Sequence, residues 1–367
     1  MGFKCGIVGL PNVGKSTLFN ALTNTAAAAA ENYPFCTIEP NVGAVPVPDD
    51  RLDKLAKVAG SQKIIETQLS FVDIAGLVRG ASKGEGLGNQ FLGNIREVDA
   101  IVHVLRSFED GDITHVEGNI NPVADAETIN TELMLSDLEA LQKKEQSLIK
   151  KARGGDKEAK NLVEMIKKIL VILEDGRPAR EFDAGDAEGR IMFRDLQLLT
   201  SKPILYVANV DEDSAAGGNP LSKSVKKMAE AEGAGCVVIS AAVESEIAML
   251  DDKNERQEFL ETMGLSETGL ARVIRHGYSL LDLITFFTVG PKEAHAWTVK
   301  TGSMGPKAAG VIHTDFEKGF IRAETIAYDD FVSLGGETGA KDNGKMRLEG
   351  KEYVVQDGDV MHFRFAN

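Results

Sequence analysis

The stretch Gly9-Leu-Pro-Asn-Val-Gly-Lys-Ser16 follows the apolar run 3–8 and precedes the apolar segment 17–22. It matches the pattern G-x-x-x-x-G-K-[ST], in which a glycine-rich loop joins a strand to a helix. The glycines allow a tight turn, so that successive N–H groups and the helix start near Lys15 can surround a phosphate. Lys15 is expected to reach the β- and γ-phosphates, and Ser16 to ligate Mg²⁺. A ligand-free glycine turn is the alternative, but the strand–loop–helix context favours a nucleoside triphosphate site.

Composition places further bounds on the chain. Its 367 residues suggest two or three domains. No apolar stretch approaches the length of a membrane span, and the first residues run into a core strand rather than a signal peptide. Cys5, Cys36 and Cys236 form neither a disulfide framework nor a metal-binding pair, and the histidines lack the spacing of zinc ligands. We therefore expect a cytoplasmic protein without a zinc site.

The order of apolar segments indicates three parts. Strand-like segments at 3–8, 68–73 and 100–106 alternate with glycine-rich loops and helices, and the alternation resumes at 203–209 and 236–240. This alternation predicts an α/β domain with a mainly parallel sheet covered by helices. The expected boundaries are 1–124 plus 201–280 for the P-loop nucleotide-binding domain, 125–200 for an inserted segment and 281–367 for a small β-rich domain.

The inserted segment has the periodicity of two amphipathic helices. Leu133, Leu141 and Leu148 are among the apolar positions of the first helix, and Gly154-Gly155 provides a turn before the second, which ends near Pro178. An antiparallel helical hairpin is therefore predicted. Residues 141–180 carry eleven Lys and Arg against six Asp and Glu, although the whole chain has a net charge of −15. Contact with a polyanion is thus expected to be confined to this segment.

Asp73-Ile-Ala-Gly76 follows the predicted strand 68–73 and is a second candidate element of the site. Asp73 can hold Mg²⁺ through water, and the Gly76 N–H can contact the γ-phosphate. Thr37 lies between the phosphate loop and Asp73, where a switch threonine would ligate Mg²⁺. The alternative for Thr37 is an ordinary loop hydroxyl.

Asn209-Val-Asp-Glu212 ends a predicted strand at the position where guanine-specific proteins carry Asn-Lys-x-Asp. The usual aspartate accepts hydrogen bonds from N1–H and the 2-amino group of guanine, whereas adenine has a lone pair at N1 and no 2-amino group. Val210 and Glu212 replace the lysine and the aspartate, which relaxes the filter for guanine. Ser240-Ala-Ala242 would close the base pocket with backbone N–H groups. The alternative is an acidic loop without this role.

These motifs together resemble those of the Obg-like ATPases of the YchF type, and the resemblance covers the whole chain. It also includes residues 32–37, Asp73-Ile-Ala-Gly-Leu77, the helical hairpin and Gly310–Phe320, which is similar to the signature of a TGS domain, a small β-grasp fold. The resemblance implies ATP hydrolysis with tolerance of GTP, and association with the ribosome, especially its large subunit. The positions that it carries over are Asn12, Val13, Gly14, Lys15, Ser16 and Thr17 at the phosphates, Ser16 and Thr37 on Mg²⁺, and Val210 with Glu212 at the base.

Hydrolysis needs a group that orients the attacking water. Leu77 occupies the position where many GTPases place a glutamine, so intrinsic hydrolysis should be slow. Asn12 lies where related enzymes bind an activating K⁺, or it is a local turn residue. His115 is the first side-chain candidate because it follows the strand 100–106 in an acidic loop, but it can equally be a surface residue. His103 is expected to be a core residue of that strand.

Three functions remain open at this point. The first is an ATPase whose cycle controls binding to the ribosome and regulates translation, with the hairpin and the C-terminal domain as its contacts. The second is a conventional GTP-specific switch with an atypical base motif, and the third is a stand-alone metabolic kinase. The basic side chains expected to contact RNA around the hairpin tip are Lys143, Lys144, Lys150, Lys151, Arg153, Lys157 and Lys160. Their alternative is a solvated helix face.

Overall fold

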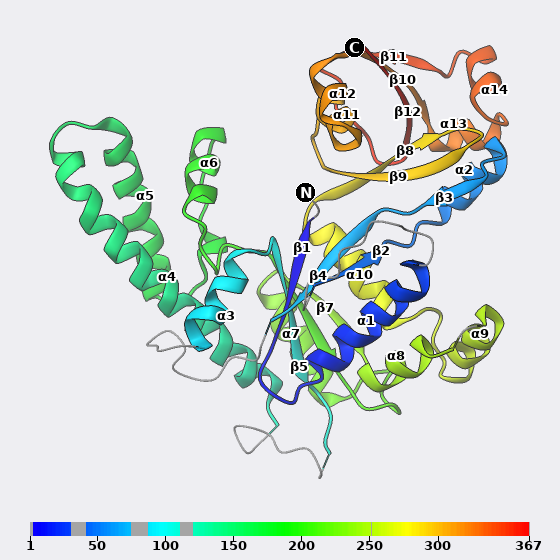
Figure 1. Ribbon diagram of the computed structural model, residues 1–367. Coiled ribbons are helices and arrows are strands. Elements are labelled where there is room, and N and C mark those ends of the chain that lie inside the picture. The colour runs from blue at the N-terminus through cyan, green and yellow to red at the C-terminus, as the bar shows by residue number, and fades with distance from the viewer. Residues whose placement is uncertain (1–2, 31–41, 75–86, 111–119, 251, 367) are drawn as a thin grey trace. The chain divides into compact units, whose positions relative to one another are not determined.

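The structure is a computed structural model that describes residues 3–30, 42–74, 87–110, 120–250 and 252–366. The chain forms two compact units (Figure 1). The first contains residues 1–44 and 70–273, and the second contains residues 45–69 and 274–367. The chain passes between them within strands β2 (Val42–Pro46) and β4 (Gln68–Asp73).

The first unit is built on a sheet with the strand order β2-β4-β1-β5-β6-β7. Strand β1 pairs in parallel with β4 and β5, and β6 pairs in parallel with β5 and β7. Every residue of β5 and β6 is buried, as expected for central strands covered on both faces. The carboxyl ends of the parallel strands share one edge, where ligands bind in open α/β sheets. The remaining strands of this sheet are β1 (Lys4–Val8), β5 (Ala100–Arg106), β6 (Ile204–Asn209) and β7 (Gly235–Ile239).

Helices connect these strands, and α1 lies beside α8 while α7 lies beside α4 (Figure 1). Two of these helices begin after residue types that are preferred at the N-cap. Asn219 caps α7 in a capping box, and Asp252 caps α9. The helices of this part are α1 (Lys15–Ala30), α3 (Leu87–Arg96), α7 (Pro220–Ala231), α8 (Ala241–Ala248), α9 (Lys253–Thr262) and α10 (Gly269–Leu280), whose last residues belong to the second unit.

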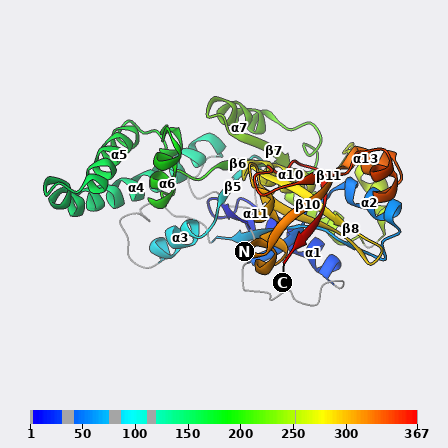
Figure 2. The same cartoon turned by 90° about the horizontal axis from the view of Figure 1, so that it is seen from above.

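The predicted helical hairpin is present. Helices α4 (Pro122–Arg153) and α5 (Lys157–Glu174) lie side by side in both views (Figures 1 and 2). The turn contains Gly155, whose φ of 92° is a left-handed conformation that glycine adopts without strain. A buried apolar cluster joins the two helices to α6 (Ala187–Asp195) and to the short 3-10 helix Ala179–Glu181.

One buried carboxylate connects the hairpin to the chain that enters β6. Asp137 of α4 accepts hydrogen bonds from the backbone N–H groups of Leu199 and Thr200, each at 2.8 Å, and from the Thr200 hydroxyl at 2.7 Å. Burial raises the pKa of Asp137, and these three donors oppose that shift because they stabilise the charged form. The carboxylate is therefore the anchor of the hairpin base.

The second unit is β-rich, with the strand order β11-β10-β12-β8-β9-β3. Apolar clusters cover both faces of its sheet: Phe287 packs with α2 and α13, and Phe286 packs with α11. Its strands are β3 (Lys63–Ile65), β8 (Leu283–Val289), β9 (Glu293–Lys300), β10 (Phe320–Ala327), β11 (Arg347–Glu349) and β12 (Asp359–Phe365). Its helices are α2 (Asp50–Ala59), α11 (Gly305–Ile312), α12 (Thr314–Lys318), α13 (Tyr328–Ser333) and α14 (Glu337–Asp342).

The two units differ from the three predicted domains: the hairpin is grouped with the first unit, the second unit takes up the chain again at residue 274 rather than 281, and it also contains an earlier segment. The sequence analysis assigned all of residues 1–124 to the nucleotide-binding domain, whereas residues 45–69 belong to the second unit. The reason is packing: Leu52 and Leu55 of α2 are buried in the same cluster as Phe287 and Phe331. No helix in the described part of the chain is both long enough and apolar enough to cross a bilayer.

Candidate nucleotide-binding site

The phosphate loop lies at the carboxyl end of β1, and α1 begins at Lys15 as predicted. Asn12 has a φ of 63° and Gly14 a φ of 95°, so the loop makes two left-handed steps before the helix. A Cβ atom at Gly9 would lie 2.5 Å from the carbonyl oxygen of Val104, so only glycine fits this approach to β5. The loop therefore has the compact form that directs backbone N–H groups toward a phosphate.

Lys15 is 8 % exposed, and its Nζ donates a hydrogen bond to the carbonyl oxygen of Leu10 at 2.6 Å. Burial lowers the pKa of Lys15 to about 8, and the nearby Asp73 opposes that shift. A triphosphate would supply stronger partners than one carbonyl, because charge-assisted hydrogen bonds are about twice as strong as neutral ones. The Lys15 ammonium group is therefore positioned beside the loop to bind a phosphate in place of the Leu10 carbonyl.

Ser16 and Asp73, two of the residues predicted to hold Mg²⁺, have side chains that lie close to each other. The Ser16 hydroxyl lies 3.5 Å from Asp73 Oδ2, and the backbone N–H of Ile74 donates to Ile7 at 3.1 Å, which fixes the end of β4 next to β1. Burial raises the pKa of Asp73, while Lys15 and Ser16 lower it. Two hard oxygen ligands at this spacing fit Mg²⁺, which usually takes one or two protein ligands, substrate phosphates and waters.

Asn209 at the end of β6 joins the phosphate loop to the segment after β7. Its Nδ2 donates to the carbonyl oxygen of Val13 at 2.9 Å, and its Oδ1 accepts from the backbone N–H of Ala241 at 2.9 Å. The side chain is 4 % exposed. A Cβ at Gly14 would collide with the Asn209 amide, which explains the glycine there. One side chain thus holds the phosphate loop and the predicted base segment in register.

The rest of the predicted base segment lies around this bridge. Val210 is 3 % exposed, and its N–H donates to Ile239 at 2.8 Å, whereas the Glu212 side chain is exposed. Ser240 is buried, and its hydroxyl has no hydrogen-bond partner among the described residues. An unpaired buried hydroxyl is costly unless a ligand or water completes it. The arrangement can therefore receive a polar group beside Ser240.

Two residues near this edge were missed by the sequence analysis. Arg106 ends β5 almost fully buried, with its guanidinium 4.8 Å from the centre of the Phe108 ring, and donates to the carbonyl oxygens of Phe108 and Asp110. Asn219 donates to the carbonyl oxygen of Ser107 at 2.6 Å. Asn219 precedes Pro220, an N-cap signal that could have been recognised. No sequence pattern distinguishes the buried Arg106 from an exposed one.

The other predicted residues fall into three groups: one is buried, two are exposed, and four lie outside the described part of the chain. His103 is a fully buried residue of β5, as expected, and burial lowers its pKa to about 3. Asn12 is exposed on the phosphate loop, and Thr17 is exposed on the first turn of α1. Four predicted residues lie outside the described part of the chain: Thr37, Gly76, Leu77 and His115.

Comparisons with known proteins agree with this geometry. Residues 4–149 match a family described as 50S ribosome-binding GTPase, and residues 283–366 match the C-terminal YchF-GTPase family, described as a protein of unknown function. The chain is 60% identical over 365 residues to the ribosome-binding ATPase YchF of Pasteurella multocida, covering 100% of this chain and 99% of that protein. It is 54% identical over 367 residues to the Bacillus subtilis protein of that name, covering 100% of both.

A solved structure extends the comparison to the fold. The Schizosaccharomyces pombe YchF GTPase superposes with a TM-score of 0.89 at 36% identity, covering 99% of this chain and 98% of that chain. The parallel sheet, the phosphate loop and the Asn209 bridge define a P-loop nucleotide-binding domain of the GTPase fold. Together with its β-rich C-terminal domain, the chain belongs to the YchF family.

Proposed function

We propose that this protein is a cytoplasmic, ribosome-associated ATPase that uses Mg²⁺, tolerates GTP and regulates translation in a nucleotide-dependent way. The observation that carries the proposal is the Asn209 bridge, which holds the atypical base motif directly beside the phosphate loop. Relatives that are similar to this chain over its whole length are named ribosome-binding ATPases. The competing function is a GTP-specific switch, and the S. pombe relative is named a GTPase.

Base selection follows from the two replaced residues. Guanine recognition needs a carboxylate that accepts from both N1–H and the 2-amino group. The apolar Val210 is buried and cannot supply the lysine of the usual motif, and the longer Glu212 is exposed. A pocket without the matched carboxylate loses its main means of rejecting adenine. Ser240 and the backbone of Ala241 would then contact the base edge.

Phosphate binding and hydrolysis would use the loop residues in distinct roles. The backbone of Asn12–Thr17 surrounds the phosphates, and Lys15 exchanges the Leu10 carbonyl for phosphate oxygens. Ser16, Asp73 and Thr37 would hold Mg²⁺, which neutralises charge on the phosphates when bound. The Gly76 N–H would contact the γ-phosphate. His115 is the proposed water-positioning group, and K⁺ near Asn12 is an additional source of positive charge.

The ribosome contact is proposed at the hairpin tip and the C-terminal domain, which we take to be a TGS domain. All seven basic residues singled out around the tip have exposed side chains. Only Lys143 among them forms an ion pair with a described residue, to Glu139 at 2.5 Å. The other six cations are available to the phosphates of RNA on the large subunit, which makes binding salt-dependent.

Two measurements test the proposal. Competition of ATP and GTP for the purified protein decides the base preference, and the proposal fails if GTP binds a hundredfold more tightly, about 2.7 kcal/mol. Co-sedimentation with large subunits, with and without ATP, tests the ribosome contact. Charge reversal of Lys150, Lys151 and Arg153 should weaken co-sedimentation and its salt dependence without changing ATP affinity, and an unchanged binding curve would exclude this surface.

A further inference from the structure

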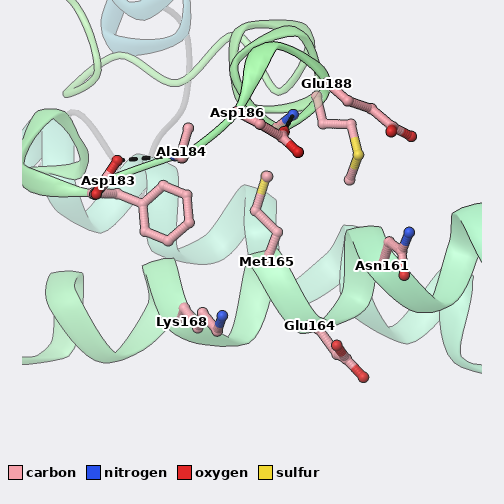
Figure 3. A pocket seen from close by; sticks show the side chains of 12 residues that line it. Asn161, Glu164, Met165, Lys168, Asp183, Ala184, Asp186 and Glu188 are labelled. Atoms are coloured by element: carbon pink, nitrogen blue, oxygen red, sulfur yellow. Dashed lines mark hydrogen bonds between the residues drawn. The ribbon is translucent and has the colours of Figure 1, made fainter.

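The hairpin carries a second surface whose charge is opposite to that of its tip. A groove lies between α5 and the segment 182–192, which includes the start of α6 (Figure 3). Its lining contains four carboxylates and one lysine: Glu164, Asp183, Asp186, Glu188 and Lys168. None of the four carboxylates forms an ion pair with any residue that the structure describes. The groove therefore has an excess of negative charge, four carboxylates against one lysine, whereas the hairpin tip is basic.

The floor of the groove is apolar. Met165 rises from α5 between the two walls, and the lining also contains Met192 and Phe182, whose ring lies 5.4 Å from that of Phe193 (Figure 3). Met165 is 9% exposed, while Met192 and Phe182 are half-buried. Methionine side chains adapt to the shape of what they contact, because they are unbranched and polarizable. Such a floor accepts aliphatic or aromatic anchors of varied shape.

The acidic wall is fixed before any partner arrives. Asp183 accepts from the Gly185 N–H at 2.9 Å, and Asp186 caps α6 by accepting from the Gly189 N–H at 2.8 Å. Arg190 donates to the Gly185 carbonyl oxygen at 2.9 Å, so this cation is directed at the backbone of the turn. A wall ordered in this way lowers the entropic cost of binding.

The chemistry of the lining indicates what would bind. Four carboxylates without ion pairs to described residues repel RNA and attract positively charged groups. The apolar floor contributes to binding only if the positively charged ligand also has apolar side chains, as a peptide can. A bound metal ion is disfavoured, because these carboxylates do not converge: among described residues, only Glu324, Glu337 and His362 bring three such ligand atoms within 4.8 Å of one another. We propose that this groove binds a lysine- or arginine-rich peptide segment of a partner protein, anchored by an aliphatic or aromatic side chain.

The test uses the full chain without nucleotide or ribosome, so its outcome is independent of the function proposed above. The probe is a fluorescein-labelled peptide of lysine with leucine at helical spacing, and binding is followed by fluorescence anisotropy. The variant Glu164→Gln/Glu188→Gln removes two exposed carboxylates that cap no helix. Its affinity should be about three- to tenfold weaker, with a smaller salt dependence. The matched control Glu174→Gln/Glu230→Gln removes the same charge from exposed positions outside the groove and should bind like the natural protein.

Further variants and probes separate this site from general attraction to an acidic protein. Asn161→Arg places a cation on the α5 wall and should weaken binding at least as much as the double neutralisation. A peptide with serine in place of leucine should bind more weakly, and hydrogen exchange should show protection at 182–192 on addition of the leucine peptide. The proposal is overturned if the groove and control variants respond equally, if the serine peptide binds as well, or if RNA competes for the protected segment.

Discussion

Replacing Asn209 tests whether one side chain assembles the nucleotide site. Asn209→Ala removes two buried hydrogen bonds of 2.9 Å and leaves the Val13 carbonyl and the Ala241 N–H without their partner. Each group left unpaired costs about 1–3 kcal/mol, so the total for the two groups is roughly 2–6 kcal/mol. Part of this loss lowers the free energy of unfolding. The remainder weakens ATP binding, because ATP must then order the phosphate loop that Asn209 no longer holds. We expect ATP affinity to fall by about ten- to a hundredfold.

Calorimetric titration measures the loss of ATP affinity, and thermal unfolding measures the loss of stability. Asn130→Ala is the matched control, since it removes a hydrogen bond of 3.1 Å to Tyr206 that involves no residue of the phosphate loop. It should lower stability by about 1 kcal/mol and leave ATP affinity unchanged. Asn209→Asp keeps an acceptor for Ala241 but turns a carboxylate toward the Val13 carbonyl, and it should impair ATP binding at least as much as alanine. ATP affinity equal to that of the Asn130 variant would refute the bridging role.

Three more predictions concern the preference for adenine or guanine, the residue that positions the attacking water, and the protonation of Lys15. Val210→Lys with Glu212→Asp should recover guanine preference by a factor of about a hundred or more, measured by competition, and an unchanged ratio would contradict the reading of the base motif. His115→Ala should lower ATP hydrolysis about tenfold or more at nearly constant ATP affinity; a variant that hydrolyses ATP as fast as the natural protein in both K⁺ and Na⁺ would show that His115 is a surface residue. Because the pKa of Lys15 is lowered to about 8 and phosphate favours its charged form, ATP binding should take up a proton and weaken as pH rises above 8. Titrations in two buffers of different ionisation enthalpy would detect that proton, and pH-independent binding up to pH 10 would refute it.

The same lysine affects stability in the unliganded protein. Its pKa is about 8 when folded and 10.5 in an ordinary environment, so between these values the unfolded chain binds more protons than the folded one. Stability from this group therefore rises as pH increases from 8 to 10.5 and is at its lowest below 8. Keeping Lys15 buried and charged at neutral pH therefore destabilises the unliganded protein. This is expected of a binding site in which the ligand supplies the negative charge.

The elements that depend on local rules were predictable from the sequence. Glycine at positions 9 and 14 and the Gly154-Gly155 turn have backbone requirements that few other residues meet, and the hairpin helices follow from apolar periodicity over many turns. The Asp73 and Asn209 positions were recognisable because each ends a strand at the same edge of the parallel sheet.

Features that depend on distant partners were not predictable. The amphipathic pattern of α2 shows that Leu52 and Leu55 are buried, but it does not say against which strands. Asp137 resembles any solvated helix carboxylate in sequence, and only the approach of Thr200 from 63 residues away gives it a buried role. The acidic groove likewise requires α5 and α6 to be brought together, so its carboxylates appear in sequence as ordinary surface charge.

Residues 45–69 belong to the second unit although the chain before and after them belongs to the first, and this limits how the protein can be cut into fragments. A fragment that starts at 281, or at the start of the matched C-terminal family at 283, lacks α2 and the edge strand β3. It would expose Phe287 and its neighbours where Leu52 and Leu55 normally pack, and a fragment ending at 280 would leave α2 with no sheet to cover. Neither piece is a self-sufficient folding unit. The C-terminal module therefore cannot be exchanged between proteins as a single cassette, because part of its core is encoded within the first seventy codons.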